Sequence, residues 1–400
     1  LESDFVAWPI YTRNRFHADL VDRERTRILF FLYSDVNEKN LTTGSAYRRP
    51  GARMLLVPGG RRVGSISGGC LEGEVSKRAW WFTGDGKPVV RVYDTSSDEE
   101  AVWEFGLGCN GVVHVLLERM QSPAALEAIE FLAARQSTRS AAAVATVIRA
   151  ADGFAVGDRL LLDGTSSPAG ALAGSSIEDA LSEQSADVLR SRESRLVHLG
   201  ELQVFIEWFG PPQSLLIFGA GHDAVPLTSI AAELGWEVTV ADGRPAYVCL
   251  ERFPGARHAV LLRPDSLLDG IAIDPDTAVV MMTHNYPLDM RLLPRIIAAR
   301  PRYLGLLGPR VRTERLFAEL GLPLASWVHG PIGLDIGSNT PSAIALSIAA
   351  EIQAALSRRP GGMLKLRTGS IHSPVLEQGT PVPFSGSVRP AYCESAVNVA

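Results

Sequence analysis

The sequence contains few cysteines, and their spacing excludes the common roles of clustered thiols. Only 4 cysteines occur among 400 residues, at positions 70, 109, 249 and 393, and no two of them form a Cys-x-x-Cys pair. This spacing argues against a structural zinc site and against the disulfide framework of a small secreted protein. A reducing, cytoplasmic compartment is therefore the expected location.

Long hydrophobic runs and an excess of one charge are also missing. The longest apolar runs, such as 28–33 and 279–282, are much shorter than the roughly 18 residues of a membrane-spanning helix, so no span is expected. The first ten residues do not have the pattern of a signal peptide. A net charge of −5 provides no positive field for nucleic acid or an anionic membrane. Small molecules and protein partners remain as ligands.

The length of 400 residues predicts two or three domains, each large enough to bury its own core. Pro211 and Pro212 form a natural hinge between a loop-rich first half and a more regular second half. We therefore expect an N-terminal domain over 1–210 and a second domain over 211–359. A tail rich in Gly, Pro and Ser is expected over 360–400.

Short apolar strands alternate with amphipathic helices between residues 214 and 357. This alternation is typical of an α/β fold with a doubly wound parallel sheet of the Rossmann type. The expected strands include 214–218, 237–241, 259–262, 278–282 and 303–307, and the expected helices are 224–234, 288–299, 312–320 and 341–356.

The first 210 residues predict a mixed α+β domain with short strands, hairpin-like glycine turns such as 84–88, and few helices. A weak internal repeat is visible, because Gly-Ala-Arg-Met-Leu-Leu at 51–56 is similar to Gly-Asp-Arg-Leu-Leu-Leu at 157–162. A glycine turn follows each segment, and then Leu71-Glu72 in one copy and Ile177-Glu178 in the other. We interpret this as one supersecondary unit used twice. Only the first copy has a Gly-Gly-Cys loop, so only this copy is expected to carry chemistry.

A dinucleotide-binding fingerprint follows the strand at 214–218. Gly219-Ala220-Gly221-His222-Asp223-Ala224 matches G-x-G-x-x-A, in which the glycines allow a tight turn and close approach of the backbone to a pyrophosphate. Asp242 lies 23 residues after Gly219, near the roughly 20 expected for an acid that binds a ribose hydroxyl. Arg244 could instead accept a 2′-phosphate, which leaves NAD and NADP both open. The cofactor-binding candidates here are Gly219, Ala220, Gly221, His222, Asp242 and Arg244.

Two further candidates, Thr283 and His284, follow the expected strand at 278–282, where ligands of such sheets bind. His284 could contact a ligand or act as an acid or base, or it could simply cap the next helix. Asp289 is a weaker acid–base candidate. Asp223 argues against a standard nucleotide site, because its charge lies in the first turn of the helix where an anion would bind.

Two glycine-rich loops of the N-terminal half contain cysteine. In the first loop, Ser67 is a possible N-cap, and Gly68-Gly69 can expose backbone amides to an anion. Cys70 would then lie in the first turn of a helix, where the dipole favours the thiolate. A small buried cysteine near a tight turn is the alternative. In the second loop, Gly108 precedes Cys109, and the two cysteines would frame one site if the loops meet.

The ordered set of motifs resembles the XdhC/CoxI family of xanthine dehydrogenase accessory factors. The segments 44–51, 64–72 and 106–111 are similar to the N-terminal domain of that family. The segments 216–222, 240–244, 282–285, 303–308 and 330–337 are similar to its C-terminal Rossmann domain. The resemblance departs from the family pattern at Tyr47, Asn110 and Asp223.

The resemblance implies a chaperone that binds molybdenum cofactor (molybdopterin), protects it during sulfuration and delivers it to a xanthine dehydrogenase-type molybdenum hydroxylase. A cysteine desulfurase is implied as a second partner, and Cys70 and Cys109 become candidate molybdenum ligands. The alternative is an NAD(P)-linked oxidoreductase that uses His284 or Asp289. A homodimer is the default expectation, since two-fold dimers are the commonest oligomers.

Overall fold

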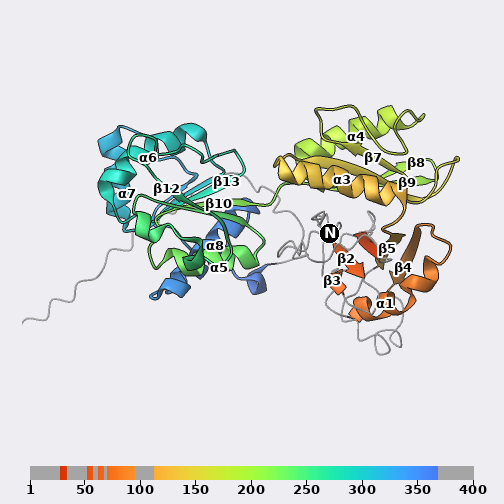
Figure 1. Ribbon diagram of the computed structural model, residues 1–400, viewed down its shortest axis with the longest axis horizontal. Helices are drawn as coiled ribbons and strands as arrows, with labels where there is room; N and C mark the ends of the chain where they lie inside the picture. Colours follow the sequence, from red (N-terminus) through yellow and green to blue (C-terminus); the bar gives the residue numbers. More distant parts are fainter. Residues whose placement is uncertain (1–27, 34–51, 57–61, 67–69, 95–111, 368–400) are drawn as a thin grey trace, which may run out of the picture.

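The computed structural model describes residues 28–33, 52–56, 62–66, 70–94 and 112–367. In Figure 1 the C-terminal sheet and its helices form one body, and two smaller sheets with their own helices form another. No helix in the described ranges has the length and apolar character needed to cross a membrane.

The C-terminal body contains a parallel sheet of the expected kind. Its order is β12-β11-β10-β13-β14-β15, which corresponds to 3-2-1-4-5-6 when the strands are numbered along the chain, as in a Rossmann fold. All neighbouring strands pair in parallel. The strands are β10 (Ser214–Phe218), β11 (Glu237–Asp242), β12 (Ala256–Leu261), β13 (Thr277–Met281), β14 (Tyr303–Leu306) and β15 (Val328–His329).

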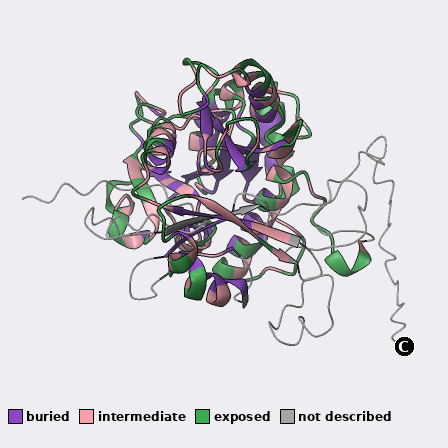
Figure 2. Ribbon diagram, turned by 90° about the vertical axis from the view of Figure 1, so that its right-hand side faces the viewer, coloured by how far each residue is buried: buried purple, intermediate pink, exposed green. Residues whose placement is uncertain are grey.

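Helices cover both faces of this sheet, as the sequence predicted. α5 (Ala224–Glu233) and α8 (Pro341–Leu356) pack on one face, and α6 (Tyr286–Ala299) and α7 (Arg310–Leu320) pack on the other. Across the described chain, with the N-terminal units in front, Figure 2 shows buried residues mainly in the strands and exposed residues mainly on the outer helices. Both sides of the central strands β10, β13 and β14 are thus removed from water, which explains their largely apolar sequence, whereas the edge strand β12 is partly exposed.

Two units of the same topology precede this body. We call residues 28–119 the first unit and residues 142–209 the second unit. The first contains β1 (Ile28–Tyr33), β2 (Arg53–Leu56), β3 (Arg62–Gly64), α1 (Cys70–Phe82), β4 (Val89–Asp94) and β5 (Val112–Arg119). The second contains β6 (Ala142–Arg149), β7 (Arg159–Leu162), α4 (Glu178–Ser191), β8 (Arg195–Leu199) and β9 (Leu202–Phe209). α3 (Pro123–Ser137) connects them.

The sheet orders confirm the internal repeat. The first sheet runs β3-β2-β1-β5-β4 and the second runs β7-β6-β9-β8, so that β2 corresponds to β7 and β5 to β9. An isolated bridge between Leu161 and Ala169 stands where β3 pairs with β2 in the first unit. One helix, α1 or α4, packs on each sheet at the same point in the chain order.

Two buried ion pairs join the units, and each takes its partners from both. Arg53 of β2 binds Glu207 of β9 at 2.6 Å, and Arg159 of β7 binds Glu118 of β5 at 2.6 Å. Strand pairing places Arg53 and Arg159 at equivalent positions, and Glu118 and Glu207 likewise. The contact therefore has the reciprocal form of a two-fold dimer interface, here within one chain.

Two expectations for this half need correction. Residues 84–88 do not close a hairpin; they connect α1 to β4. The N-terminal half also contains more helix than expected, because α3 and α4 were not recognised. Both helices have small or polar residues at many positions, and their burial depends on the sheet beneath them.

Candidate functional site

The glycine loop after β10 has the backbone geometry that its sequence indicates. Gly219 has a positive φ of 114°, and a Cβ at this position would lie 2.3 Å from the Met282 carbonyl oxygen, so only glycine fits. In contrast, nothing lies within 4 Å of a Cβ placed on Gly221. α5 begins at Ala224, which is fully buried and lets the helix pack closely on the sheet.

Asp242 lies at the end of β11 beside this loop, where the sequence placed it. Its carboxylate accepts hydrogen bonds from the Ala220 amide at 2.7 Å and from the Arg244 amide at 2.8 Å. The Arg244 side chain donates two more, from Nε at 3.0 Å and from Nη2 at 2.8 Å. Burial alone would raise the pKa of Asp242, but these bonds hold it below its ordinary value. Asp242 is therefore ionised at neutral pH.

The aromatic ring of Tyr247 fixes the position of Arg244. The ring lies 3.9 Å from the Arg244 guanidinium carbon and 4.7 Å from that of Arg252. Arg252 also donates to the Ala220 carbonyl at 3.1 Å, which ties this pair to the glycine loop. Two cations thus lie next to the loop, of which Arg244 remains half exposed.

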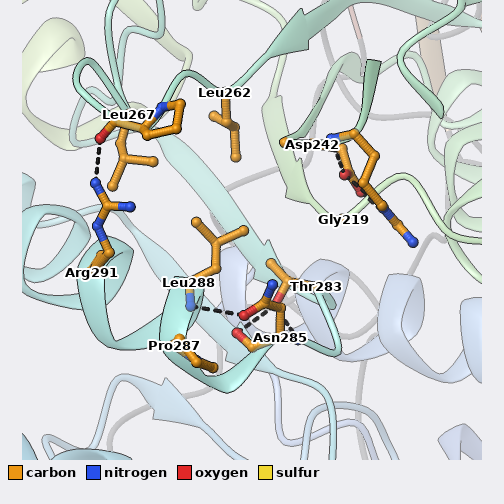
Figure 3. A pocket seen from close by; sticks show the side chains of 12 residues that line it. Gly219, Asp242, Leu262, Leu267, Thr283, Asn285, Pro287, Leu288 and Arg291 are labelled. Carbon is orange, nitrogen blue, oxygen red and sulfur yellow. Dashed lines mark hydrogen bonds and ion pairs between the residues drawn. The ribbon is translucent and has the colours of Figure 1, made fainter. Parts of the chain in front are cut away.

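A cavity of about 320 Å³ opens beside these residues, at the carboxyl ends of the parallel strands. This is where ligands of open α/β sheets bind. Figure 3 shows Arg291 and Asp242 on opposite sides of the cavity, with Thr283 and Asn285 below it. Its lining residues are Gly219, Asp242, Gly243, Arg244, Leu262, Pro264, Leu267, Thr283, Asn285, Pro287, Leu288 and Arg291.

His284 and Asp223 form a pair next to the glycine loop. The His284 Nε2 atom lies 3.4 Å from the Asp223 carboxylate, and His284 has a positive φ of 53°. The helix cap that was an alternative role for His284 belongs to Asn285, whose side chain accepts from the Leu288 amide at 3.0 Å. The Asp223 side chain makes no capping hydrogen bond to α5 and instead faces His284.

Asp289 is buried within a structural contact between helices. It accepts hydrogen bonds from the Thr283 hydroxyl and, at 2.8 Å, from Arg312 Nη2 of α7. Burial raises the pKa of Asp289, and the bonds from Thr283 and Arg312 oppose that shift. With 4% of its surface exposed, Asp289 offers little to a substrate.

The first cysteine loop is described only from its helical end. α1 begins at Cys70, so this residue starts a helix as predicted, and Glu72 follows in the first turn. The buried Glu72 carboxylate accepts from the Ser65 hydroxyl at 2.8 Å and from the Ile66 amide at 3.1 Å. Glu72 therefore links Ser65 and Ile66, which precede the loop, to the start of α1, which follows it. Ser67, Gly68, Gly69, Gly108 and Cys109 lie outside the described residues, as does the Cys70 side chain.

Sequence reasoning missed several residues of the cavity and its surroundings. Tyr247, Arg252 and Arg291 belong to no motif; the first two lie in short 3₁₀ turns and Arg291 lies within α6. Asn285 carried a usable signal, because an asparagine three residues before Leu288 is a typical N-cap. No group of three or more His, Cys, Asp or Glu side chains in the described ranges could hold a metal ion.

Comparison with known proteins agrees with this geometry. A family model for the XdhC Rossmann domain matches residues 215–352, and one for the XdhC and CoxI family matches residues 41–94. A probable xanthine dehydrogenase subunit of Bacillus subtilis (strain 168) is 33% identical over 327 residues, covering 80% of this chain and 94% of that protein. The chain belongs to the XdhC and CoxI family.

Two other relatives align with this chain over nearly their whole length. The molybdenum cofactor insertion chaperone PaoD of Escherichia coli (strain K12) is 24% identical over 365 residues, covering 87% of this chain and 95% of that protein. A crystal structure described as a xanthine dehydrogenase from Bacillus halodurans superposes with a TM-score of 0.70 at 27% identity. It covers 86% of this chain and 95% of the other. The XdhC fold is thus shared from the N-terminal units to the Rossmann-like body.

Proposed function

We propose that this XdhC family member binds molybdenum cofactor and assists its sulfuration and insertion into a xanthine dehydrogenase-type molybdenum hydroxylase. One observation carries the proposal. A cavity whose charged lining residues, Arg244, Arg291 and Asp242, sum to a net positive charge lies at the ligand-binding edge of the Rossmann-like sheet, in a chain that aligns with 95% of the length of a molybdenum cofactor insertion chaperone at 24% identity. An accessory factor of this kind needs to hold an anionic cofactor, and such a cavity supplies the required charge.

Two regions of this chain, which lie in the separate bodies of Figure 1, each fit one part of the cofactor. The phosphate-bearing part suits the Rossmann cavity, with Gly219, Ala220, Gly221, His222, Arg244, Thr283 and His284 as its proposed binding residues and Asp242 as the carboxylate that holds Arg244. When bound, the cofactor supplies a molybdenum centre held by a dithiolene, for which cysteine thiolate is a soft ligand. We assign Cys70 and Cys109 to that centre, with Ser67, Gly68, Gly69 and Gly108 supplying backbone groups.

Cys70 begins a helix, and this supports its assignment. The amides of a first helical turn stabilise negative charge and so favour thiolate at neutral pH. Glu72 holds the start of this helix against Ser65 and Ile66 through two hydrogen bonds. The first unit therefore places Cys70 at the start of a helix that Glu72 links by hydrogen bonds to Ser65 and Ile66.

The wider organisation follows from the same proposal. We place the domains at 1–210 and 211–359, with the segment 360–400 as a tail, and we place the protein in the cytoplasm as a homodimer. A cysteine desulfurase is the proposed source of sulfur. NAD(P) remains a second candidate for the cavity, but Asp289 is buried against Arg312 and does not support acid–base chemistry there.

Cofactor retention tests the proposal. The full chain is produced together with the molybdenum cofactor pathway, and pterin fluorescence and molybdenum content are measured after purification. We expect wild type to retain both, and Cys70→Ala and Cys109→Ala to retain at least about tenfold less. Cys249→Ala is the matched control, because Cys249 is partly exposed and hydrogen-bonds to Glu251 of its own loop. Absence of pterin in wild type, or equal retention by all three variants, would overturn the assignment.

A further inference from the structure

The hydrogen bonds of Asp242 decide which ligand the Rossmann cavity can take. In a standard NAD site the acid at this position accepts hydrogen bonds from the ribose hydroxyls. An ionised carboxylate has about four acceptor positions, two on each oxygen. Here Oδ2 accepts from the Ala220 amide and Arg244 Nη2, and Oδ1 accepts from the Arg244 amide and Nε. All four positions are occupied by groups of the protein itself.

A ribose diol would therefore have to displace an arginine from a buried carboxylate. That exchange replaces a bond between two oppositely charged groups with one from a neutral hydroxyl, and it separates Arg244 from its carboxylate partner. Asp242 has 5% of its surface exposed, so water cannot compensate the change. The residue that normally selects a free diol is thus committed to holding Arg244 in place.

Arg244 itself keeps donors for a ligand. Its Nε and Nη2 atoms face Asp242, while Nη1 has no acceptor in the described part of the chain and the side chain is 51% exposed. Tyr247 stacks on the guanidinium, which fixes its plane. Arg291 adds a second cation across the cavity, so two arginines and one aspartate leave a net positive charge. A fixed guanidinium at such a site suits a phosphate group.

We propose that the Rossmann cavity recognises a phosphomonoester through Arg244, and that Asp242 acts as the residue that positions this arginine. The inference rests on the proposed function, since it specifies the ligand class of the same cavity. Two sources of the group share this chemistry: the terminal phosphate of a pterin cofactor and the 2′-phosphate of a nucleotide such as NADP. An unphosphorylated ribose diol, as in NAD, is excluded as the preferred ligand.

Pairs of probes that differ by one phosphate test the proposal on the full chain by calorimetry. The nucleotide arm compares ADP-ribose with 2′-phospho-ADP-ribose, and the pterin arm compares 6-hydroxymethylpterin with its phosphate. We expect the phosphorylated probe to bind at least about tenfold more tightly in one arm, and that arm identifies the source. Equal affinity within both arms, tighter binding of ADP-ribose, or no binding of any probe would overturn the inference.

Variants connect the preference to Arg244. Arg244→Gln is expected to reduce the preference for the phosphorylated probe to less than about threefold. The double variant Asp242→Asn with Arg244→Gln removes both charges, so it tests the loss of the cation without leaving a buried carboxylate unpaired. Arg257→Gln is the control, because Arg257 also pairs with a carboxylate, Glu237, but lies near the opposite end of the strands. A preference that survives in folded Arg244 variants, or disappears in Arg257→Gln, contradicts the proposal.

The result is separable from the cofactor-retention test. If Cys70-dependent retention of pterin is found but neither arm shows a phosphate preference, this inference is wrong and the proposed function stands. If the preference is found but no pterin is retained, the phosphate site stands and the proposed function fails.

Discussion

The two N-terminal units share a framework and differ in the loop that leads into their helix. Both have an arginine at the start of the second strand and a glutamate on the last strand, and these residues exchange partners across the contact. In the first unit the helix begins at Cys70 and the buried Glu72 holds the preceding segment. In the second, Ser176 is the equivalent of Cys70 and is exposed, and α4 begins only at Glu178.

This difference shows which parts of a duplicated unit are constrained by the fold and which by chemistry. The ion pairs must be kept by both copies, because a single unpaired arginine or glutamate would leave a buried charge. The sequence before the helix differs between the copies, whereas the two ion pairs come from the strands. The following predictions test this separation.

The largest effect is expected from the inter-unit ion pair. Arg159→Ala leaves Glu118 fully buried without its partner and should reduce the free energy of unfolding by about 3–5 kcal/mol. Arg53→Ala should lower the free energy of unfolding by a smaller amount, because burial raises the pKa of Glu207 and allows this carboxyl to take up a proton. Urea unfolding measures both.

A double variant controls this comparison. Arg159→Met with Glu118→Leu replaces the pair by apolar side chains and should recover most of the lost stability. If Arg159→Ala costs no more than an ordinary surface substitution, the pair does not hold the units together and the comparison between them loses its basis.

The second prediction concerns the glutamates that follow each loop. Glu72→Ala removes the acceptor of the Ser65 hydroxyl and the Ile66 amide in a buried setting and should cost about 1–3 kcal/mol. Glu178→Ala in the second unit should stay within about 0.5 kcal/mol, because Glu178 is partly exposed and its contact is to Gly174. Thermal and urea unfolding of the two variants provide the measurement, and equal costs would show that the loops are equally constrained.

The third prediction transfers the comparison to function. Cys70→Ser should lower the retained molybdenum and pterin at least about tenfold, equivalent to about 1.4 kcal/mol. Ser176→Ala, at the equivalent position of the second unit, should leave retention unchanged. Both substitutions are small, and circular dichroism checks that the fold is preserved. Loss of retention in Ser176→Ala would place chemistry in the second unit as well.

The sequence predicted the parts of this molecule that depend on local patterns. The strand at 214–218, the glycine turn at Gly219 and the helix after it follow from apolar periodicity and from backbone constraints. The repeat is visible in the sequence because Arg53 and Arg159 lie in similar segments, two residues after a glycine and before an apolar run. Their pairing with Glu207 and Glu118 was not visible, since those glutamates lie 154 and 41 residues away in sequence.

The candidate site shows the same limit. Gly219 and Asp242 could be placed from their spacing, but three of the four hydrogen bonds that occupy Asp242 depend on how Arg244 turns back on it. Tyr247, which stacks on Arg244, lies in a short 3₁₀ turn with no periodic signal. Ligand class therefore depends on side-chain contacts that a motif does not encode.

The smallest effect should come from Glu207, and it depends on pH. Burial raises the pKa of Glu207 above its ordinary 4.5, although Arg53 and Arg159 oppose the shift. The folded protein then keeps a proton that the unfolded chain has released, so this stabilising contribution is complete below pH 4.5 and declines as pH rises through the raised pKa. Gln at this position does not titrate. The free energy of unfolding of Glu207→Gln should therefore rise relative to that of wild type by up to about 1 kcal/mol between pH 4 and pH 7. Urea midpoints at four pH values measure this, with the exposed Glu201→Gln as control. Parallel curves for Glu207→Gln and wild type would mean that the arginines keep Glu207 ionised, and that the two inter-unit pairs are electrostatically equivalent.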